Sequence, residues 1–383
     1  MTSTECPAIV TYAPQPEPDL RCEQVLVSTS LEDHQLLVQM VATGLCQLEV
    51  HLSSDSEALG GSKYPRILGH EGAGYVKAVG AKVEAAKVGD AVVLSYDYCE
   101  ACRLCSQSQP AYCENFHQLN ILGDNGSKFR AIGNPHSPIV GGFFGQSSLS
   151  SLSVVSERAV VRISELLKDE GELKLFGPLG CGFQTGAGAV TIAGSAASGD
   201  VVVVTGLGAV GFGAIMAAKI AGCKTIIAID QVDSRLGLAK QIGATAVLTT
   251  ADRRDLRKEL SNCLGDRRLS LVIETTGAPN VIEVLVDCMG HRGRYIQIGI
   301  PNKSNSGASI NLPVLSLVKK RIIVEGNAQG SATATEFIPR MIQWYREGKF
   351  PIDKLIQPFP ADNFASALRG MRDGSVIKPV LIW

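Results

Sequence analysis

Residues 200–230 read DVVVVTGLGAVGFGAIMAAKIAGCKTIIAID, and this stretch decides the fold. The uncharged, β-branched run at 201–204 predicts a short parallel strand that is buried on both faces. A glycine-rich turn follows at once, then an alanine-rich helical segment, and Asp230 closes a second apolar strand. The stretch therefore predicts one continuous unit of strand, turn, helix and strand.

The turn GLGAVG at 206–211 matches the GxGxxG fingerprint of dinucleotide-binding sites. Its first glycine allows a tight turn, its second lets a pyrophosphate approach the backbone, and its third lets the helix pack on the sheet. Asp230 stands where an acid accepts hydrogen bonds from the ribose hydroxyls, and a carboxylate there repels a 2′-phosphate. We therefore predict NAD rather than NADP. The predicted cofactor-binding residues of this motif are Gly206, Gly208, Ala209, Val210, Gly211 and Asp230.

A membrane span is the rival interpretation of residues 201–218, which carry no charge over roughly the minimum spanning length. Four glycines and the alternation of strand and helix argue against it. Residues 233–250 and 269–301 repeat the rhythm of helix then strand. This alternation predicts a parallel, doubly wound sheet.

Length and charge restrict the classes of protein. A chain of 383 residues predicts two domains, and a net charge of −1 gives no reason to expect nucleic acid or an anionic membrane as a partner. The N-terminal residues show no basic segment followed by an apolar one, so we expect a cytoplasmic protein. Eleven cysteines in such a protein favour metal binding over disulfides.

Four cysteines are clustered in one short segment, with the pattern C-x-x-C-x-x-C-x7-C at 99–113. Four thiolates can close a tetrahedral shell around zinc, and a closed shell is structural rather than catalytic. The alternative is a chance cluster of reduced cysteines without metal. The predicted structural zinc ligands are Cys99, Cys102, Cys105 and Cys113.

Three further signals are weaker when taken alone. Residues up to about 95 form short β-like runs, and Cys46 and the pair His70-Glu71 lie among them. A buried cysteine is usually a small apolar residue, and a lone histidine is usually a hydrogen-bonded polar group. Cys181 lies in the glycine-rich segment GPLGCGFQTGAGAV, which we interpret as a domain junction.

Together these motifs resemble the zinc-containing alcohol dehydrogenases of the medium-chain dehydrogenase/reductase family over nearly the whole chain. The order of Cys46, His70-Glu71, the four cysteines, Cys181, the glycine turn and its acid carries the resemblance. It implies an α/β fold in which a GroES-like, β-rich catalytic domain at 1–181 is completed by 326–383. A Rossmann NAD-binding domain is implied at 182–325. The segment FFGQSS at 143–148 is similar to aryl- and benzyl-alcohol dehydrogenases.

The resemblance implies roles for individual residues. Cys46, His70 and Cys181 fall on the three ligands of the catalytic zinc, whose fourth position stays open for water or substrate. Glu71 falls on the acid beside the ligand histidine, and Glu49 on the acid that orients this histidine. The other implied cofactor-binding residues are Thr185, Arg235, Ile298 and Lys378. The candidate substrate-pocket residues are Leu48, Phe143 and Phe144, although paired phenylalanines are more often part of a core.

Two positions depart from the family pattern. Leu48 stands where relatives have the Ser or Thr that passes the alcohol proton outward, and leucine carries no exchangeable proton. Loss of a positioned proton carrier costs ~10²–10⁴-fold in rate unless another group replaces it. His51 falls on an outer relay position and leaves part of this path in place. Gln47 stands where several relatives have a basic residue on the pyrophosphate.

The sequence therefore predicts an NAD- and zinc-dependent oxidoreductase that acts on an apolar alcohol or aldehyde, a class that includes aromatic ones. The alternative is a reductase of a conjugated double bond or an iminium on the same scaffold, since that reaction needs no alcohol proton relay. A third possibility is a nucleotide-binding protein without turnover, which the intact zinc ligands disfavour. The resemblance also implies a homo-oligomer, either a dimer or a tetramer.

Overall fold

The computed structural model describes residues 2–14, 18–54, 63–124, 128–250, 255–301, 309 and 312–383. The chain forms two compact units. The first unit comprises Met1–Cys181, Thr333–Gln343 and Ile352–Trp383, and the second comprises Gly182–Ala332 and Trp344–Pro351. Each unit is described by itself below.

The first unit contains two sheets of mostly antiparallel strands. One sheet has the order β4 (Arg66–Ile67), β1 (Ser3–Thr11), β2 (Leu20–Ser28), β7 (Phe129–Ala131) and β8 (Asn134–Ile139). The other has the order β10 (Val160–Arg162), β6 (Ala91–Leu94), β5 (Gly72–Val79), β3 (Gln35–Gly44), β18 (Lys378–Ile382) and β17 (Ile356–Pro360), with β9 (Leu152–Ser156) also paired to β3. Its helices are α1 (Gln47–Ser54), α2 (Arg103–Ser106), α3 (Glu170–Phe176), α11 (Phe364–Arg372) and the first part of α10 (Ala334–Arg346).

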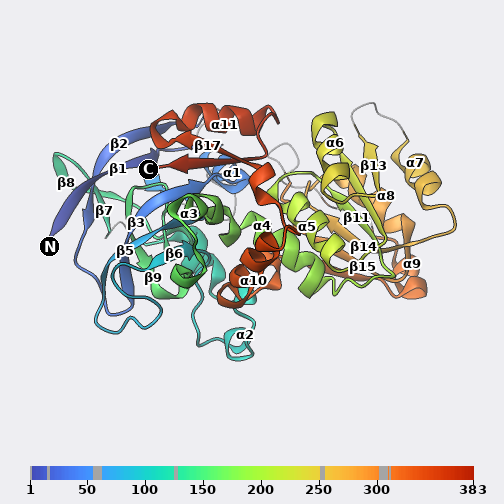
Figure 1. The fold of residues 1–383 in the computed structure, drawn as a ribbon, viewed down its shortest axis with the longest axis horizontal. Coiled ribbons are helices and arrows are strands. Elements are labelled where there is room, and N and C mark those ends of the chain that lie inside the picture. Colours follow the sequence, from blue (N-terminus) through green and yellow to red (C-terminus); the bar gives the residue numbers. More distant parts are fainter. Residues whose placement is uncertain are drawn as a thin grey trace. The chain divides into compact units, whose positions relative to one another are not determined.

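Strand β3 lies at the centre of the second of these sheets. Its inward side chains Leu36, Val38 and Met40 belong to one hydrophobic core, to which β5, β6 and β9 contribute their own apolar residues. The C-terminal strand β18 pairs antiparallel with β3, and in Figure 1 the red end of the chain lies beside blue strands. The last residues therefore complete the sheet of the first unit.

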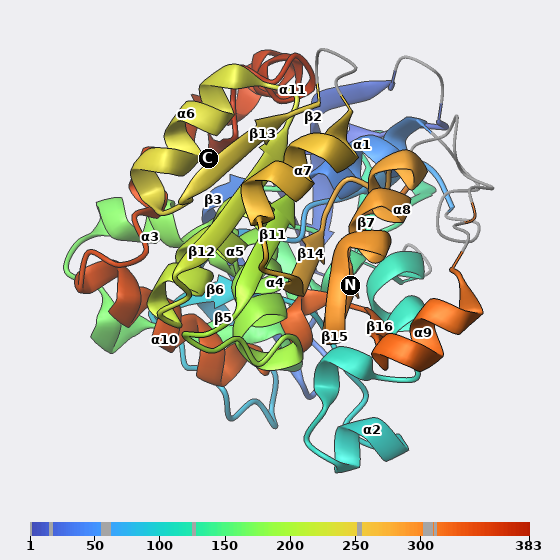
Figure 2. The same cartoon turned by 90° about the vertical axis from the view of Figure 1, so that its right-hand side faces the viewer.

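The second unit contains a parallel sheet with helices on its faces (Figure 2). The strand order is β13 (Ala246–Thr249), β12 (Thr225–Asp230), β11 (Val201–Thr205), β14 (Leu269–Glu274), β15 (Met289–Gln297) and β16 (Ile323–Gly326). Its helices are α4 (Gly182–Gly188), α5 (Ala209–Ile220), α6 (Asp233–Ile242), α7 (Leu256–Leu264), α8 (Pro279–Cys288) and α9 (Val314–Lys320). The order reverses between β11 and β14, which is the switch point where doubly wound sheets bind ligands.

Strand β11 shows why this sequence forms a central parallel strand. All of its residues are buried. Val201 and Val203 belong to the core under α7 and α8. Val204 faces the opposite side, where a Cβ added to Gly211 of α5 would lie 3.5 Å from its Cγ1 atom. Both faces are therefore covered, and the predicted α/β class with a β-rich part and a doubly wound sheet is confirmed.

The second predicted domain boundary, between residues 325 and 326, falls inside β16. The following residues stay with the second unit, which continues to Ala332. They do so because the turn at 329–331 packs tightly on α4, where a Cβ added to Gly188 would lie 2.3 Å from the carbonyl oxygen of Gly330. Backbone contact between two glycines gives no apolar pattern in the sequence.

Within the described ranges, no helix is long and apolar enough to cross a membrane. Helix α5 has 12 residues, which span about 18 Å at 1.5 Å per residue. A bilayer core is about 30 Å thick.

Candidate active site

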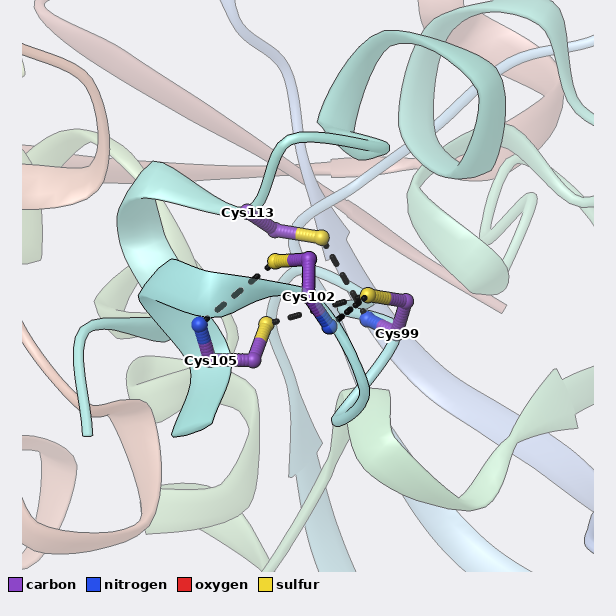
Figure 3. Close-up of side chains that lie close together, drawn as sticks. All are labelled: Cys99, Cys102, Cys105 and Cys113. Carbon is purple, nitrogen blue, oxygen red and sulfur yellow. Dashed lines mark hydrogen bonds between the residues drawn. The ribbon is translucent and has the colours of Figure 1, made fainter. Parts of the chain in front are cut away.

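The four cysteines at 99–113 form one cluster in the first unit, with sulfur atoms facing one another (Figure 3). All four sulfur atoms lie within 4.8 Å of one another, and those of Cys99 and Cys105 are 4.0 Å apart. Zinc–sulfur bonds of about 2.3 Å in a tetrahedron place the sulfurs about 3.8 Å apart. The donor set therefore fits a closed zinc site.

Backbone and side-chain donors surround these sulfurs. The amide of Cys102 donates to Cys99 Sγ at 3.3 Å, and the amide of Glu114 donates to Cys102 Sγ at 3.4 Å. A hydrogen bond from the Asn115 side chain, with backbone amides, lowers the pKa of Cys99 to about 6. Hydrogen bonds to sulfur favour the thiolate form that binds metal.

A second cluster forms from residues that are far apart in the sequence. Cys46 precedes α1, His70 and Glu71 lie between β4 and β5, and Cys181 ends the first of the three segments that make up the first unit. Their ligand atoms lie within 4.8 Å of one another, and His70 Nε2 is 3.1 Å from Cys181 Sγ. The structure therefore brings together the residues predicted to hold the catalytic zinc, and all of them belong to the first unit.

Glu49 fixes the orientation of the His70 imidazole. Its Oε1 atom is 2.5 Å from His70 Nδ1, and its Oε2 atom accepts a hydrogen bond from the Cys46 amide at 2.8 Å. With Nδ1 bound to a carboxylate, Nε2 is the ring nitrogen that faces the sulfurs. Burial disfavours protonation of His70, but the Glu49 and Cys46 charges raise its pKa well above the ordinary value. The longer glutamate therefore reaches the histidine where relatives usually have aspartate.

Glu71 forms a buried ion pair with Lys378. The Nζ atom of Lys378, in β18, lies 2.8 Å from both carboxylate oxygens of Glu71 and 2.9 Å from the carbonyl oxygen of Leu45. Burial lowers the pKa of Lys378, but the Glu71 carboxylate outweighs this effect and raises the pKa above its ordinary value. Because Lys378 neutralises the Glu71 carboxylate, Cys46, His70 and Cys181 remain as the metal donors of this cluster. That set fits a catalytic zinc with one open position.

Replacing Glu49 with glutamine tests its orienting role. We expect the Glu49→Gln protein to bind zinc at the Cys46 cluster about 10-fold to 100-fold more weakly, because the imidazole loses its charged partner. Competition with a chromophoric chelator measures this affinity. Glu157→Gln is the matched control, since Glu157 also contacts a histidine, His34 at 2.8 Å, away from both cysteine clusters. Equal zinc affinities in the two variants would contradict the role of Glu49.

Two phenylalanines contact the His70 imidazole. The Phe144 ring is stacked on it with centroids 4.5 Å apart, and the Phe143 ring meets it edge-on at 5.4 Å. Both side chains are buried. Leu48 and His51, which are half-buried, lie three residues apart on α1, so they share one face of the helix. The structure therefore places the predicted pocket residues Phe143 and Phe144 against a metal-site side chain.

The glycine turn lies in the second unit, between β11 and α5. Gly206 has φ = +80°, and a Cβ added to Gly211 would lie 1.9 Å from the Gly206 carbonyl oxygen. A Cβ added to Gly208 would meet no atom within 4 Å. The turn therefore leaves open space beside Gly208 at the start of α5, which fits a pyrophosphate on a helix N-terminus.

Asp230 holds this turn in place. It ends β12, and its carboxylate accepts hydrogen bonds from the amide of Leu207 at 2.5 Å and of Val232 at 2.8 Å. The remaining predicted cofactor residues of the second unit are Thr185 in α4, Arg235 in the first turn of α6, and Ile298 directly after β15. Lys378 belongs to the first unit and lies in the Glu71 pair described above.

Sequence reasoning missed two residues around these sites, Glu274 and Phe116, and one pairing, that of Glu71 with Lys378. Glu274 is buried at the end of β14, where it accepts hydrogen bonds from the amides of Thr276 and Gly277. An acid that closes a buried strand, as Asp230 does, was the available signal. The pairing of Glu71 with Lys378 and the contact of Phe116 with Phe144 leave no signal in spacing, because each joins distant segments.

Comparison with known proteins agrees with this geometry. A family described as "Alcohol dehydrogenase GroES-like domain" matches residues 32–165, and one described as "Zinc-binding dehydrogenase" matches residues 209–347. The chain is 33% identical over 368 residues to a geraniol dehydrogenase from Castellaniella defragrans, covering 95% of this chain and 94% of the relative. It is 36% identical over 268 residues to a probable alcohol dehydrogenase from a Pseudomonas species, covering 70% and 83%.

Two solved structures are also similar over essentially their whole length. A zinc-binding alcohol dehydrogenase domain protein from Burkholderia ambifaria has a TM-score of 0.90 at 33% identity, with 100% of this chain and 99% of that chain covered. Benzyl alcohol dehydrogenase from Acinetobacter calcoaceticus has a TM-score of 0.88 at 32% identity, with 99% of both chains covered. The chain belongs to the zinc-containing alcohol dehydrogenases of the medium-chain dehydrogenase/reductase family.

Proposed function

We propose that this protein is an NAD-dependent dehydrogenase of primary alcohols whose carbinol carbon adjoins a double bond or an aromatic ring. The observation that carries the proposal is the cluster of half-buried Cys46 with buried His70 and Cys181, a donor set that leaves one position open on a tetrahedral zinc ion. Two similar proteins are named for geraniol and benzyl alcohol, and in both alcohols the carbinol carbon adjoins a double bond or an aromatic ring. The rings of Phe143 and Phe144 beside His70 support an apolar substrate.

A zinc ion at this site supplies a Lewis acid for the alcohol or carbonyl oxygen, and NAD supplies the hydride acceptor. Cys46, His70 and Cys181 hold the ion, and Glu49 keeps the imidazole in the required orientation. Lys378 neutralises Glu71 and so keeps this carboxylate from competing for the ion. The chain's own residues thus provide a donor set whose histidine is held in a fixed orientation.

Leu48 shapes the proton path. It places no hydroxyl two residues after Cys46, so the alcohol proton leaves by water, with His51 as the next titratable group on that face of α1. The same observation supports the second candidate, a reductase of conjugated double bonds or iminium groups. In that reaction the substrate requires no relay from an alcohol oxygen.

Matched alcohols test the proposal. Geraniol and benzyl alcohol are compared with citronellol and cyclohexylmethanol, which lack the conjugated bond, and NADH formation is followed at 340 nm. We expect kcat/KM to be at least about tenfold higher for each conjugated alcohol, because the product aldehyde gains conjugation as it forms. Equal rates within both pairs would contradict the substrate class. No oxidation of any of the four would contradict the alcohol dehydrogenase assignment.

The cofactor preference depends on Asp230. We expect Asp230→Asn to raise the ratio of kcat/KM for NADP to that for NAD by about 10-fold to 100-fold, since a charge-assisted hydrogen bond is worth about 1.5–3 kcal/mol. Initial rates with each cofactor measure the ratio. Asp200→Asn is the control. Asp200 directly precedes β11, at the end of the strand opposite the glycine turn, and pairs with Arg294. A ratio that Asp230→Asn leaves unchanged would argue against NAD selection by this carboxylate.

A homo-oligomer, dimer or tetramer, is also proposed. Strand β16 is the edge of the parallel sheet, and Ile323 and Val324 on it are exposed. In the adjoining helix α9, Val314, Leu315 and Val318 are 73%, 64% and 69% exposed. An apolar sheet edge of this kind is usually covered by a partner. A monomer by sedimentation at micromolar concentration would contradict the proposal.

The cytoplasm is the proposed compartment. All eleven cysteines are free thiols, and six of them belong to the two predicted metal-binding sets. A reducing compartment keeps such thiols available for metal.

A further inference from the structure

A chain of aromatic rings joins the four-cysteine cluster to the catalytic metal cluster. Phe144 is stacked on His70, and Phe116 meets Phe144 edge-on with centroids 5.8 Å apart and planes at 86°. Phe116 also contacts Tyr96 at 6.0 Å. Phe116 lies three residues after Cys113, so the ring that touches Phe144 is carried by the cysteine cluster.

The position of Phe116 is set by the four-cysteine cluster. Its amide donates to the carbonyl oxygen of Cys113 at 2.9 Å, and the preceding residue, Asn115, hydrogen-bonds the sulfur of Cys99. On the other side, the buried Asn120 side chain donates to the carbonyl oxygens of Phe116 and Asp97, both at 2.9 Å. Asp97 lies two residues before Cys99, and Phe116 lies three residues after Cys113. The Asn120 side chain therefore links the two ends of the cysteine segment.

Phe144 itself needs support from its neighbours. It has φ = +54° and ψ = +34°, a left-handed conformation, and its side chain is only 3% exposed. A bulky residue keeps this conformation only where its surroundings hold it there. His70 lies against one side of the ring and Phe116 against another, so Phe116 is one of the groups that hold it.

Residues 116–121 also support Phe143, the second ring that contacts His70. The carbonyl oxygen of Ile121, five residues after Phe116, accepts a hydrogen bond from Arg66 Nη2 at 2.8 Å. The Arg66 guanidinium lies over the Phe143 ring, 5.2 Å from its centroid. Both phenylalanines that contact the His70 imidazole are therefore supported by residues 116–121.

We propose that Phe116 is a positioning residue, through which the four-cysteine cluster sets Phe144 against His70 and so fixes the plane of the imidazole at the catalytic metal site. The proposal deepens the proposed function and rests on it for the identity of the reaction. The metal in the four-cysteine cluster then acts on the active site as well as on its own loop. Phe116 acts through Phe144 and is not required to touch the substrate.

Cadmium-113 NMR of the cadmium-substituted protein tests this coupling directly. A site with four sulfur ligands and a site with two sulfurs and one nitrogen give separate resonances. We expect Phe116→Ala to shift the resonance of the Cys46 cluster and to leave the four-sulfur resonance in place. Phe116→Tyr, which keeps the ring, returns the shifted resonance to its wild-type position.

The matched control is Phe364→Ala, another half-buried phenylalanine of the first unit, at the start of α11. We expect it to leave both resonances unchanged. If Phe116→Ala lowers the melting temperature but both cadmium signals stay at their wild-type positions, Phe116 is a packing residue only and the proposal is overturned. If the alanine variant does not fold, Phe116→Leu takes its place, because leucine also removes the aromatic ring but leaves a smaller cavity.

A double variant tests whether the two rings act in series. We expect Phe144→Ala to shift the Cys46-cluster resonance, and the further change Phe116→Ala to add nothing, because the ring that transmits the effect is gone. Fully additive shifts would overturn the proposal. Kinetically, Phe116→Ala is expected to lower kcat/KM for benzyl alcohol by about 10-fold to 100-fold, with Phe116→Tyr near wild type.

The proposed reaction and the positioning role of Phe116 can fail independently in these experiments. A wild-type protein that shows both cadmium signals but oxidises no alcohol contradicts the proposed reaction, while the shift caused by Phe116→Ala still decides the positioning role. A wild-type spectrum with the four-sulfur signal alone overturns both, since the Cys46 cluster then binds no metal.

Discussion

Replacing Cys46 with alanine lowers the zinc content from about two ions per chain to about one, because one of the two donor sets then lacks a thiolate. Alcohol oxidation falls by about 10³-fold or more, since a Lewis acid contributes several kcal/mol to such a reaction. Elemental analysis of the purified protein measures the first effect, and initial rates measure the second. The remaining ion belongs to the four-cysteine cluster, whose sulfurs form a separate set.

Cys6→Ala is the matched control for this experiment. Cys6 is also a buried cysteine of the first unit, but it contacts Ser150 and lies outside both metal-binding sets. We expect it to keep about two ions and full activity. If Cys46→Ala also keeps about two ions, Cys46 is not a ligand. If wild type and variant both hold about one, only the four-cysteine cluster is metallated.

Replacing Lys378 with methionine produces the largest expected loss of stability. Lys378 and Glu71 are 2% and 0% exposed, and the change leaves the Glu71 carboxylate buried without its cation. Breaking a buried ion pair in this way costs about 3–5 kcal/mol. Urea unfolding followed by circular dichroism measures the loss, with the midpoint compared between variants.

Two further variants serve as controls for the Lys378→Met result. Lys82→Met breaks an ion pair with Asp33 whose side chains are 66% and 53% exposed, and we expect it to cost at most about 1 kcal/mol. Glu71→Gln combined with Lys378→Met removes both charges and recovers part of the stability. If Lys378→Met unfolds no more easily than Lys82→Met, the buried pair does not stabilise the first unit.

The parts of the structure that the sequence predicts well are encoded within short segments. The strand at 201–204, the glycine turn and Asp230 lie within 31 residues, and each has a residue type that only one local geometry explains. The four cysteines at 99–113 are equally local. The parallel, doubly wound sheet and the burial of its first strand on both faces follow from these patterns.

The catalytic cluster was predictable only in part. Cys46, His70 and Cys181 are isolated signals in the sequence, and only the family resemblance grouped them before the structure brought them together. The resemblance assigns Lys378 to the cofactor, and its ammonium group also pairs with Glu71, 307 residues away. A pairing over that separation depends on how β18 joins β3, which no local pattern encodes.

The aromatic contacts around His70 were beyond sequence reasoning for a related reason. Phe143 and Phe144 are consecutive, which suggests a core as readily as a pocket, and Phe116 follows a metal-binding segment without any periodic pattern. Their stacking depends on the left-handed backbone of Phe144. Such a conformation in a phenylalanine is imposed by its neighbours and opposes the local preference.

The most direct test of the central claim follows a labelled hydride. The purified protein is given NADH deuterated at C4 and cinnamaldehyde, which contains both a carbonyl group and a conjugated double bond, and the product is examined by NMR. In alcohol dehydrogenase chemistry the aldehyde takes the deuteride at its carbonyl carbon and a proton at its oxygen, giving NAD and cinnamyl alcohol. We therefore predict the label at the carbinol carbon, and a label at the carbon β to the carbonyl would contradict the account.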